Sequence, residues 1–145
     1  MSEKIQSQAR SQILLVEDNP GDVFLIQEAI GGEDGAELRV VTDGEQALEY
    51  LAAAETGGSR RAPDLILLDI NLPKRSGDEI LARIRAGALT RDVPVIVVTS
   101  SESPRERAHM MELGADYYFS KPINLDEYMK IGAITRRLLA EAHKR

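Results

Sequence analysis

Acidic residues close two short apolar runs of this 145-residue chain. Glu17 and Asp18 follow the run QILLV, and Asp69 follows the run LILL at residues 65–68. A buried carboxylate without a partner is too costly to persist, so each should be paired, solvated or used chemically. Three carboxylates close together would also repel and raise one another's pKa unless a cation lay among them. The pattern therefore points to a cation site.

A hydroxyl pair and a lysine stand at the ends of two later runs. Thr99 and Ser100 end VPVIVVTS, and Lys121 follows DYYFS. Carboxylate, carbonyl and water oxygens are the hard ligands that suit Mg²⁺. A carboxylate beside Mg²⁺ and a lysine could attack phosphorus and hold an acyl phosphate. The metal and Lys121 would then neutralise the charge that develops on the transferred group, so phosphoryl transfer is the predicted chemistry.

These residues can meet only if the elements around them form one sheet. Apolar runs that predict strands alternate with stretches of helical periodicity. The predicted strands span residues 12–17, 37–42, 64–69, 93–100 and 116–120. Four predicted helices lie within 18–30, 44–54, 103–114 and 124–145, the last capped by Asn124, and Ile80, Leu81 and Ile84 mark another helix after Gly77. This order predicts a doubly wound α/β fold, a five-stranded parallel sheet with helices on both faces. Sites in such folds form beyond the carboxyl ends of the strands, where the acids, hydroxyls and lysine would converge.

Composition and charge exclude several classes of function. The chain is 43% hydrophobic and 29% charged, as ordinary single globular domains are, and we expect a flexible leader at residues 1–11 before a domain at residues 12–145. It has no cysteine, which excludes disulfides, thiolate catalysis and zinc–sulfur sites and permits a cytoplasmic location. No apolar run reaches the roughly 18–20 residues of a membrane span. The net charge of −6 argues against nucleic-acid binding.

Four segments together resemble the receiver domains of two-component response regulators. In chain order they are ILLVEDN at residues 13–19, LILLDINLP at 65–73, VIVVTS at 95–100 and YYFSKP at 117–122. The resemblance extends from about Ile13 into the last helix and implies the flavodoxin-like (βα)5 fold of that family. It also implies a phosphoacceptor signalling protein and not an enzyme. Self-phosphorylation and slow autodephosphorylation are expected at one aspartate.

The resemblance assigns roles to individual residues. It implies that Asp69 is the phosphoacceptor, supplied by a phosphohistidine on a sensor histidine kinase or by a histidine phosphotransfer protein. Asp18 and Asp69 would bind Mg²⁺ directly, Glu17 would bind it directly or through water, and the Asn71 carbonyl would complete the protein's share. Thr99 and Lys121 would each contact a phosphoryl oxygen.

The same resemblance suggests how a signal would leave the domain. Thr99 would move toward the phosphoryl group, and Tyr118, at the family's switch position, would turn into the vacated space. The surface formed by residues 103–114, strand 116–120 and the last helix would change shape as a two-state element. With no output domain expected, the message would pass by binding a downstream protein or a second copy of the chain.

Longer stretches point to a subfamily within the receivers. The loop ETGGSRRAP and the stretch LPKRSGDEILARIRAGALTRDVPVIVVTSS are similar to those of single-domain regulators paired with bacterial phytochromes. The segment ELGADYY before the fifth strand instead has the form general to receivers, without the asparagine that those regulators often carry there. The resemblance thus names a phytochrome-type kinase as one candidate donor.

Alternative functions remain at this stage. A degenerate receiver would bind partners without phosphate, and the intact set of Asp18, Asp69, Thr99 and Lys121 argues against it. An aspartyl-phosphate hydrolase of the haloacid dehalogenase type would need a second acid two positions after Asp69, where this chain has Asn71. A phosphate-binding glycine loop for nucleotides is absent from the sequence, and its two histidines lack companion metal ligands.

Overall fold

Five parallel strands form a single sheet in the computed structural model, which describes residues 10–31, 36–56 and 61–143. The strands are β1 (Ser11–Val16), β2 (Ala36–Val41), β3 (Leu65–Asp69), β4 (Val95–Thr99) and β5 (Tyr117–Ser120). Their order across the sheet is β2-β1-β3-β4-β5, so the chain winds outward in both directions from β1. The order reverses beside β1 and β3, and an open sheet of this kind has a crevice at that switch point.

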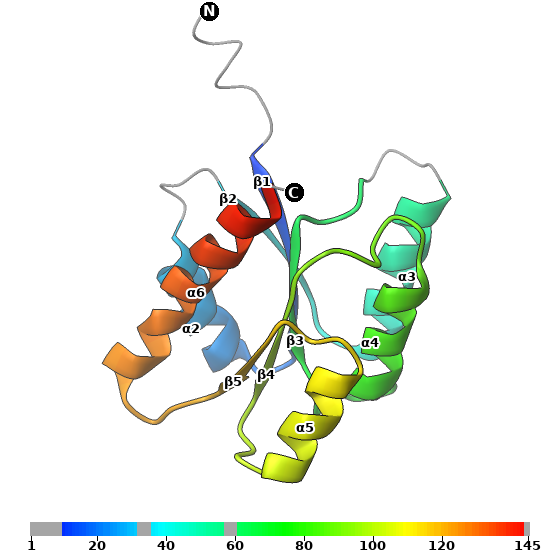
Figure 1. The fold of residues 1–145 in the computed structure, drawn as a ribbon. Helices are drawn as coiled ribbons and strands as arrows, with labels where there is room; N and C mark the ends of the chain where they lie inside the picture. Colours follow the sequence, from blue (N-terminus) through cyan, green and yellow to red (C-terminus); the bar gives the residue numbers. More distant parts are fainter. Residues whose placement is uncertain (1–9, 32–35, 57–60, 144–145) are drawn as a thin grey trace, which may run out of the picture.

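Five helices connect the strands and cover both faces of the sheet. They are α2 (Pro20–Ile30), α3 (Gly44–Glu55), α4 (Gly77–Ala86), α5 (Pro104–Glu112) and α6 (Leu125–His143). Helices α2 and α6 lie side by side on one face, and α3, α4 and α5 lie on the other (Figure 1). The predicted three-layer, doubly wound α/β fold is confirmed.

The central strands are buried on both faces. Every residue of β3 and of β4 is buried, as the continuous apolar runs predict for the middle of a parallel sheet. Alternate side chains of β3 enter different cores. Leu65 and Leu67 pack with α2 and α6, whereas Ile66 and Leu68 pack with α3, α4 and α5. A rigid strand thus carries Asp69 at its carboxyl end.

Polar side chains fix where the helices begin. Asn19, Asp43, Ser76 and Ser103 each accept a hydrogen bond from a backbone N–H in the first turn of the helix that follows. The predicted cap at Asn124 is confirmed, because its side chain accepts from the backbone N–H of Glu127 at 3.1 Å. These caps place the first turns of α2 and α6 beside the carboxyl edge of the sheet.

Element boundaries differ from the predicted ones by one or two residues. Strand β4 begins at Val95, two residues after the predicted start, because Pro94 has no N–H to donate to the ladder. Strand β1 begins at Ser11, one residue before its predicted start, and residues 1–9 of the predicted leader lie outside the described structure. Among the helices of the described segments, none combines the length and the apolar content needed to cross a bilayer.

Close approach of α6 to α2 depends on Gly132. A Cβ built on this glycine would overlap the backbone carbonyl oxygen of Ala29. We expect Gly132→Ala to lower the free energy of unfolding by about 1–3 kcal/mol, because the overlap outweighs alanine's better helix propensity. Urea unfolding followed by circular dichroism measures this. Ala133→Gly, at an exposed position of the same helix, should cost less than about 1 kcal/mol, and equal losses would contradict the packing argument.

Candidate functional site

Three carboxylates meet at the carboxyl ends of β1 and β3. One oxygen from each of Glu17, Asp18 and Asp69 lies within 4.8 Å of the others. Glu17 and Asp69 are buried, with 0% and 4% of their surface exposed, and Asp18 is exposed. The fold thus collects the acids of two sequence segments that are about fifty residues apart.

Glu17 is held in an environment that resists ionisation. Its Oε2 accepts a hydrogen bond from the backbone N–H of Asn19 at 3.2 Å. Its Oε1 is buried and accepts no hydrogen bond within the described segments, although the ammonium of Lys121 lies 3.1 Å away. Burial, then the hydrogen bond and the negative charge of Asp69, raise the pKa of Glu17 to about 8. In the metal-free site Glu17 is therefore largely protonated near neutral pH.

Lys121 supplies the positive charge of the cluster. Its backbone N–H donates to the carbonyl of Thr99 at 2.6 Å, which ties the residue after β5 to the end of β4. The ammonium lies 2.8 Å from Asp22 Oδ2, 3.1 Å from Glu17 Oε1 and 3.7 Å from Asp69 Oδ2. Burial lowers the pKa of Lys121, but the hydrogen bond to Asp22 and the charges of Glu17 and Asp69 outweigh it, so the pKa is raised. Lys121 is thus protonated when the site is metal-free.

The segment after β3 turns at Asn71. The backbone N–H of Asn71 donates to Asp69 Oδ1 at 3.0 Å, which orients the carboxylate toward the cluster. The side chain of Asn71 is an amide and carries no acidic proton. It therefore cannot supply the general acid that an aspartyl-phosphate hydrolase needs at this position.

Thr99 and Tyr118 lie on the neighbouring strands. Thr99 is buried at the end of β4, one residue past the register partner of Asp69, and its hydroxyl accepts from the backbone N–H of Ser101 at 3.0 Å. Tyr118 is 5% exposed, and its hydroxyl donates to Glu106 Oε1 at 2.6 Å. Burial and the hydrogen bond to Glu106 raise the pKa of Tyr118 to about 12. In this conformation Tyr118 is tied to α5.

Asp22 and Tyr128 belong to the cluster, although the sequence did not single them out. Asp22 lies in the first turn of α2, where an acid is ordinarily explained by the helix dipole. Tyr128 lies in α6 among residues of helical periodicity, where a buried ring is ordinarily core. Its hydroxyl donates to Asp22 Oδ1 at 2.7 Å. Only the distances reveal this connection, since the two residues are 106 positions apart in sequence.

The donor set fits a small divalent cation. The described site offers three carboxylates, two of them buried, and one buried carboxylate oxygen that accepts no hydrogen bond. Hard oxygen donors of this kind suit Mg²⁺, and the chain has no cysteine thiolate to favour a softer metal. A cation among them would also displace the proton that Glu17 holds near neutral pH.

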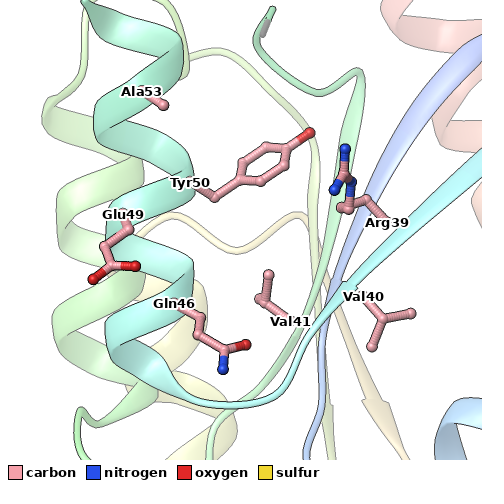
Figure 2. Close-up of a pocket in the computed structure, with 7 residues that line it drawn as sticks. All are labelled: Arg39, Val40, Val41, Gln46, Glu49, Tyr50 and Ala53. Atoms are coloured by element: carbon pink, nitrogen blue, oxygen red, sulfur yellow. The ribbon is translucent and has the colours of Figure 1, made fainter.

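A groove lies apart from these acids, on the edge of the sheet. It has a volume of about 270 Å³ and lies between β2 and α3. Figure 2 shows Arg39 and Tyr50 facing each other across it, with Gln46 and Glu49 on the α3 side. None of the residues of the acidic cluster lines it. The groove is therefore separate from the candidate site.

Comparison with known proteins agrees with this geometry. Residues 13–132 match the model of the response regulator receiver domain, which is most of the chain. The chain belongs to the response regulator receiver family. This match confirms the resemblance seen in the four sequence segments. The acidic cluster lies at the carboxyl ends of β1 and β3 of this receiver.

Several relatives of this receiver are known. The response regulator Rcp1 of Synechocystis is 36% identical over 120 residues, which is 82% of each chain. The crystal structure of the phosphorylated cyanobacterial phytochrome response regulator RcpA matches this chain with a TM-score of 0.82 and 38% sequence identity. The match covers 92% of this chain and 96% of RcpA. The Mn²⁺-bound structure of Rcp1 has a TM-score of 0.80 and 34% identity, over 89% and 94% of the two chains. The transcriptional regulatory protein CiaR of Streptococcus pneumoniae is 39% identical, and the match spans 52% of its length.

Proposed function

We propose that this receiver accepts a phosphoryl group on Asp69 from a phosphohistidine of a sensor histidine kinase or a histidine phosphotransfer protein, in the cytoplasm. The observation that carries the proposal is the position of the buried Asp69 carboxylate among two further acids and one ammonium at the switch point of the sheet. The domain acts as a signalling protein and not as an enzyme with a separate substrate.

The transfer exchanges one phosphorus bond for another. An Asp69 carboxylate oxygen attacks phosphorus, a P–O bond forms, the P–N bond to the donor imidazole breaks, and the imidazole leaves with the electron pair. The Asn71 N–H holds the other carboxylate oxygen in place. Lys121, 3.7 Å from Asp69, stabilises charge on the phosphoryl oxygens, and the Thr99 hydroxyl donates to another of them. Later attack by water on phosphorus releases phosphate and restores the carboxylate.

Mg²⁺ fits the three carboxylates and, when bound, would supply charge neutralisation for the transferred group. Asp18 and Asp69 would bind it directly, Glu17 directly or through water, and the Asn71 carbonyl would complete the protein's share. The related response regulator Rcp1 has been crystallised in an Mn²⁺-bound form, which supports a divalent ion here.

One of these relatives supports a phytochrome-type kinase as the donor. RcpA is described as a phytochrome response regulator, and it covers nearly the whole of this chain at 38% identity. Output would pass through binding, either to a downstream protein or in a homodimer, by a change at the surface formed by α5, β5 and α6.

Phosphorylation by a small donor tests the function without knowledge of the kinase. The purified protein is incubated with Mg²⁺ and acetyl phosphate, and its intact mass is measured. We expect a gain equal to one phosphoryl group, and chelation of the metal should prevent it. Absence of any gain with acetyl phosphate and with phosphorylated kinases would favour the degenerate receiver that binds partners without phosphate.

Tyr118 should be needed for output and not for phosphorylation. Tyr118→Ala removes the ring that is tied to Glu106 on α5 and leaves the acidic cluster intact. We expect the phosphoryl gain to persist while phosphorylation-dependent association weakens by about tenfold or more, as measured by sedimentation velocity. Tyr50→Ala is the matched control, because it truncates a buried tyrosine between β2 and α3, away from the surface formed by α5, β5 and α6. Equal association of wild type and Tyr118→Ala would contradict a switch role.

Two exposed apolar side chains lie close in sequence to site residues and favour a protein donor over a small one. Phe24 is 60% exposed and Ile123 fully exposed, each two residues from a member of the Asp22–Lys121 ion pair. We expect Phe24→Ala with Ile123→Ala to slow phosphorylation by the cognate kinase by about tenfold or more, because apolar anchors carry much of the energy of protein contacts. The rate with acetyl phosphate should stay the same. Leu89→Ala, exposed elsewhere, is the control, and equal slowing with both donors would rule out a docking role.

A further inference from the structure

Lys121 has a nearer partner than the proposed phosphoacceptor. Its ammonium lies 2.8 Å from Asp22 Oδ2 and 3.7 Å from Asp69 Oδ2. Asp22 is not one of the three acids that could share a cation, and it reaches Lys121 from the first turn of α2. The lysine side chain is 13% exposed and that of Asp22 is 19% exposed, so solvent weakens their attraction only in part. In the unphosphorylated protein the ammonium is thus held by a group outside the reacting set.

The second oxygen of Asp22 is also occupied. It accepts the hydroxyl proton of Tyr128 at 2.7 Å. Tyr128 is 4% exposed, packs edge to face against Phe119 with ring centroids 5.8 Å apart, and belongs to α6. Asp22 therefore joins the ammonium of the site to the start of the last helix through two short hydrogen bonds.

Phosphorylation of Asp69 would change the balance of charges around this ammonium. The phosphoryl group adds about −1.5 to −2 charges on strong acceptor oxygens. A single carboxylate at Asp22 is the weaker competitor for an ammonium that is already close to Asp69. An exchange of partners by Lys121 would leave Asp22 with Tyr128 alone and remove the positive charge that balances it.

We propose that Asp22 is a positioning residue that competes with the phosphoryl group for Lys121, and that its hydrogen bond with Tyr128 carries this exchange to α6. The proposal rests on phosphorylation of Asp69 as described above. It assigns to α2 and α6 a response to phosphorylation that is separate from the Thr99 and Tyr118 switch on the other side of β5. The two helices pack closely side by side, so α2 would move with α6 (Figure 1).

Beryllofluoride, a phosphoryl mimic that binds aspartate in the presence of Mg²⁺, provides the test. Its affinity is measured for wild type, Asp22→Asn, Tyr128→Phe and Glu28→Gln by titration followed by ¹H–¹⁵N NMR. Glu28→Gln is the matched control because it removes one exposed acid from the same helix. We expect Asp22→Asn to bind about fivefold more tightly than wild type, because the competitor for Lys121 has lost its charge, and Glu28→Gln to bind within about twofold.

The NMR spectra distinguish a link to α6 from a general effect of charge. In wild type and Glu28→Gln, saturation should shift the backbone amides of the first turn of α6 around Tyr128. Those shifts should disappear in Asp22→Asn and Tyr128→Phe, while shifts around Asp69 and Thr99 remain in all four proteins. Persistence of the α6 shifts in Tyr128→Phe, or equal affinities of Asp22→Asn and Glu28→Gln, would overturn the proposal. Failure of wild type to bind beryllofluoride would instead overturn the function on which it rests.

Discussion

Asp69→Asn is expected to lose the whole of the phosphoryl mass gain that wild type shows with acetyl phosphate and Mg²⁺. The amide that replaces the carboxylate is a poor nucleophile and cannot form an acyl phosphate. The change is nearly isosteric, and it removes the buried negative charge that disfavours ionisation of Glu17. The metal-free variant should therefore be at least as stable as wild type, so the loss of phosphorylation cannot be assigned to unfolding. Intact mass and thermal unfolding measure the two effects.

Asp92→Asn is the matched control for this change. Asp92 is an exposed aspartate before β4, at the opposite edge of the sheet from the acidic cluster. Its variant should keep the full mass gain. A gain that survives in Asp69→Asn would show that phosphate is attached elsewhere, and the proposed function would then be wrong.

Binding of Mg²⁺ should strengthen steeply with pH up to about pH 8. The pKa of Glu17 in the metal-free protein is raised to about 8, chiefly by burial and then by Asp69. A cation must displace the proton that Glu17 holds below this pH, so we expect the apparent affinity to rise by up to about tenfold per pH unit and to level off above pH 8. Isothermal titration calorimetry in buffers of different ionisation enthalpy measures both the affinity and the proton released.

The same group makes the metal-free protein less stable as pH rises. A carboxyl group with a folded-state pKa of about 8 and an ordinary value of 4.5 favours the folded state fully below about pH 4.5, and this contribution is lost as pH rises toward 8. We expect Tm without metal to fall by about 5 °C between about pH 6 and pH 8, and Mg²⁺ to reduce the fall. Glu17→Gln should show neither dependence. An affinity for Mg²⁺ that is constant over this range would mean that Glu17 is already ionised.

Much of the fold follows from local patterns in the sequence. Continuous apolar runs at residues 65–68 and 95–98 can be buried on both sides only in the middle of a parallel sheet, and that is where β3 and β4 lie. Helical periodicity between the runs requires crossover connections, which fixes the doubly wound architecture. The ends of the elements follow less directly from the sequence. The apolar run of β4 begins at Val93, but the strand begins only at Val95, because Pro94 has no N–H to donate to the ladder.

The site residues that follow the ends of strands could be predicted from the sequence. Parallel strands bring their carboxyl ends to one edge, so Glu17, Asp18 and Asp69 could be expected together before any distance was known. Thr99 and Lys121 belong to the same edge for the same reason. Their order along the chain was specific enough to indicate the receiver family.

Tertiary structure alone determined which groups contact Lys121. Asp22 and Tyr128 come from helices whose periodicity predicts a buried face but not which neighbour that face meets. Asp22 reaches Lys121, and Tyr128 reaches Asp22, because α6 packs closely on α2. The two contacting pairs are 99 and 106 residues apart in sequence. The sequence therefore determined the fold, the edge of the sheet and the type of chemistry. Packing between distant segments decides which groups contact the Lys121 ammonium. The same packing decides the protonation of Glu17 and the connection to α6.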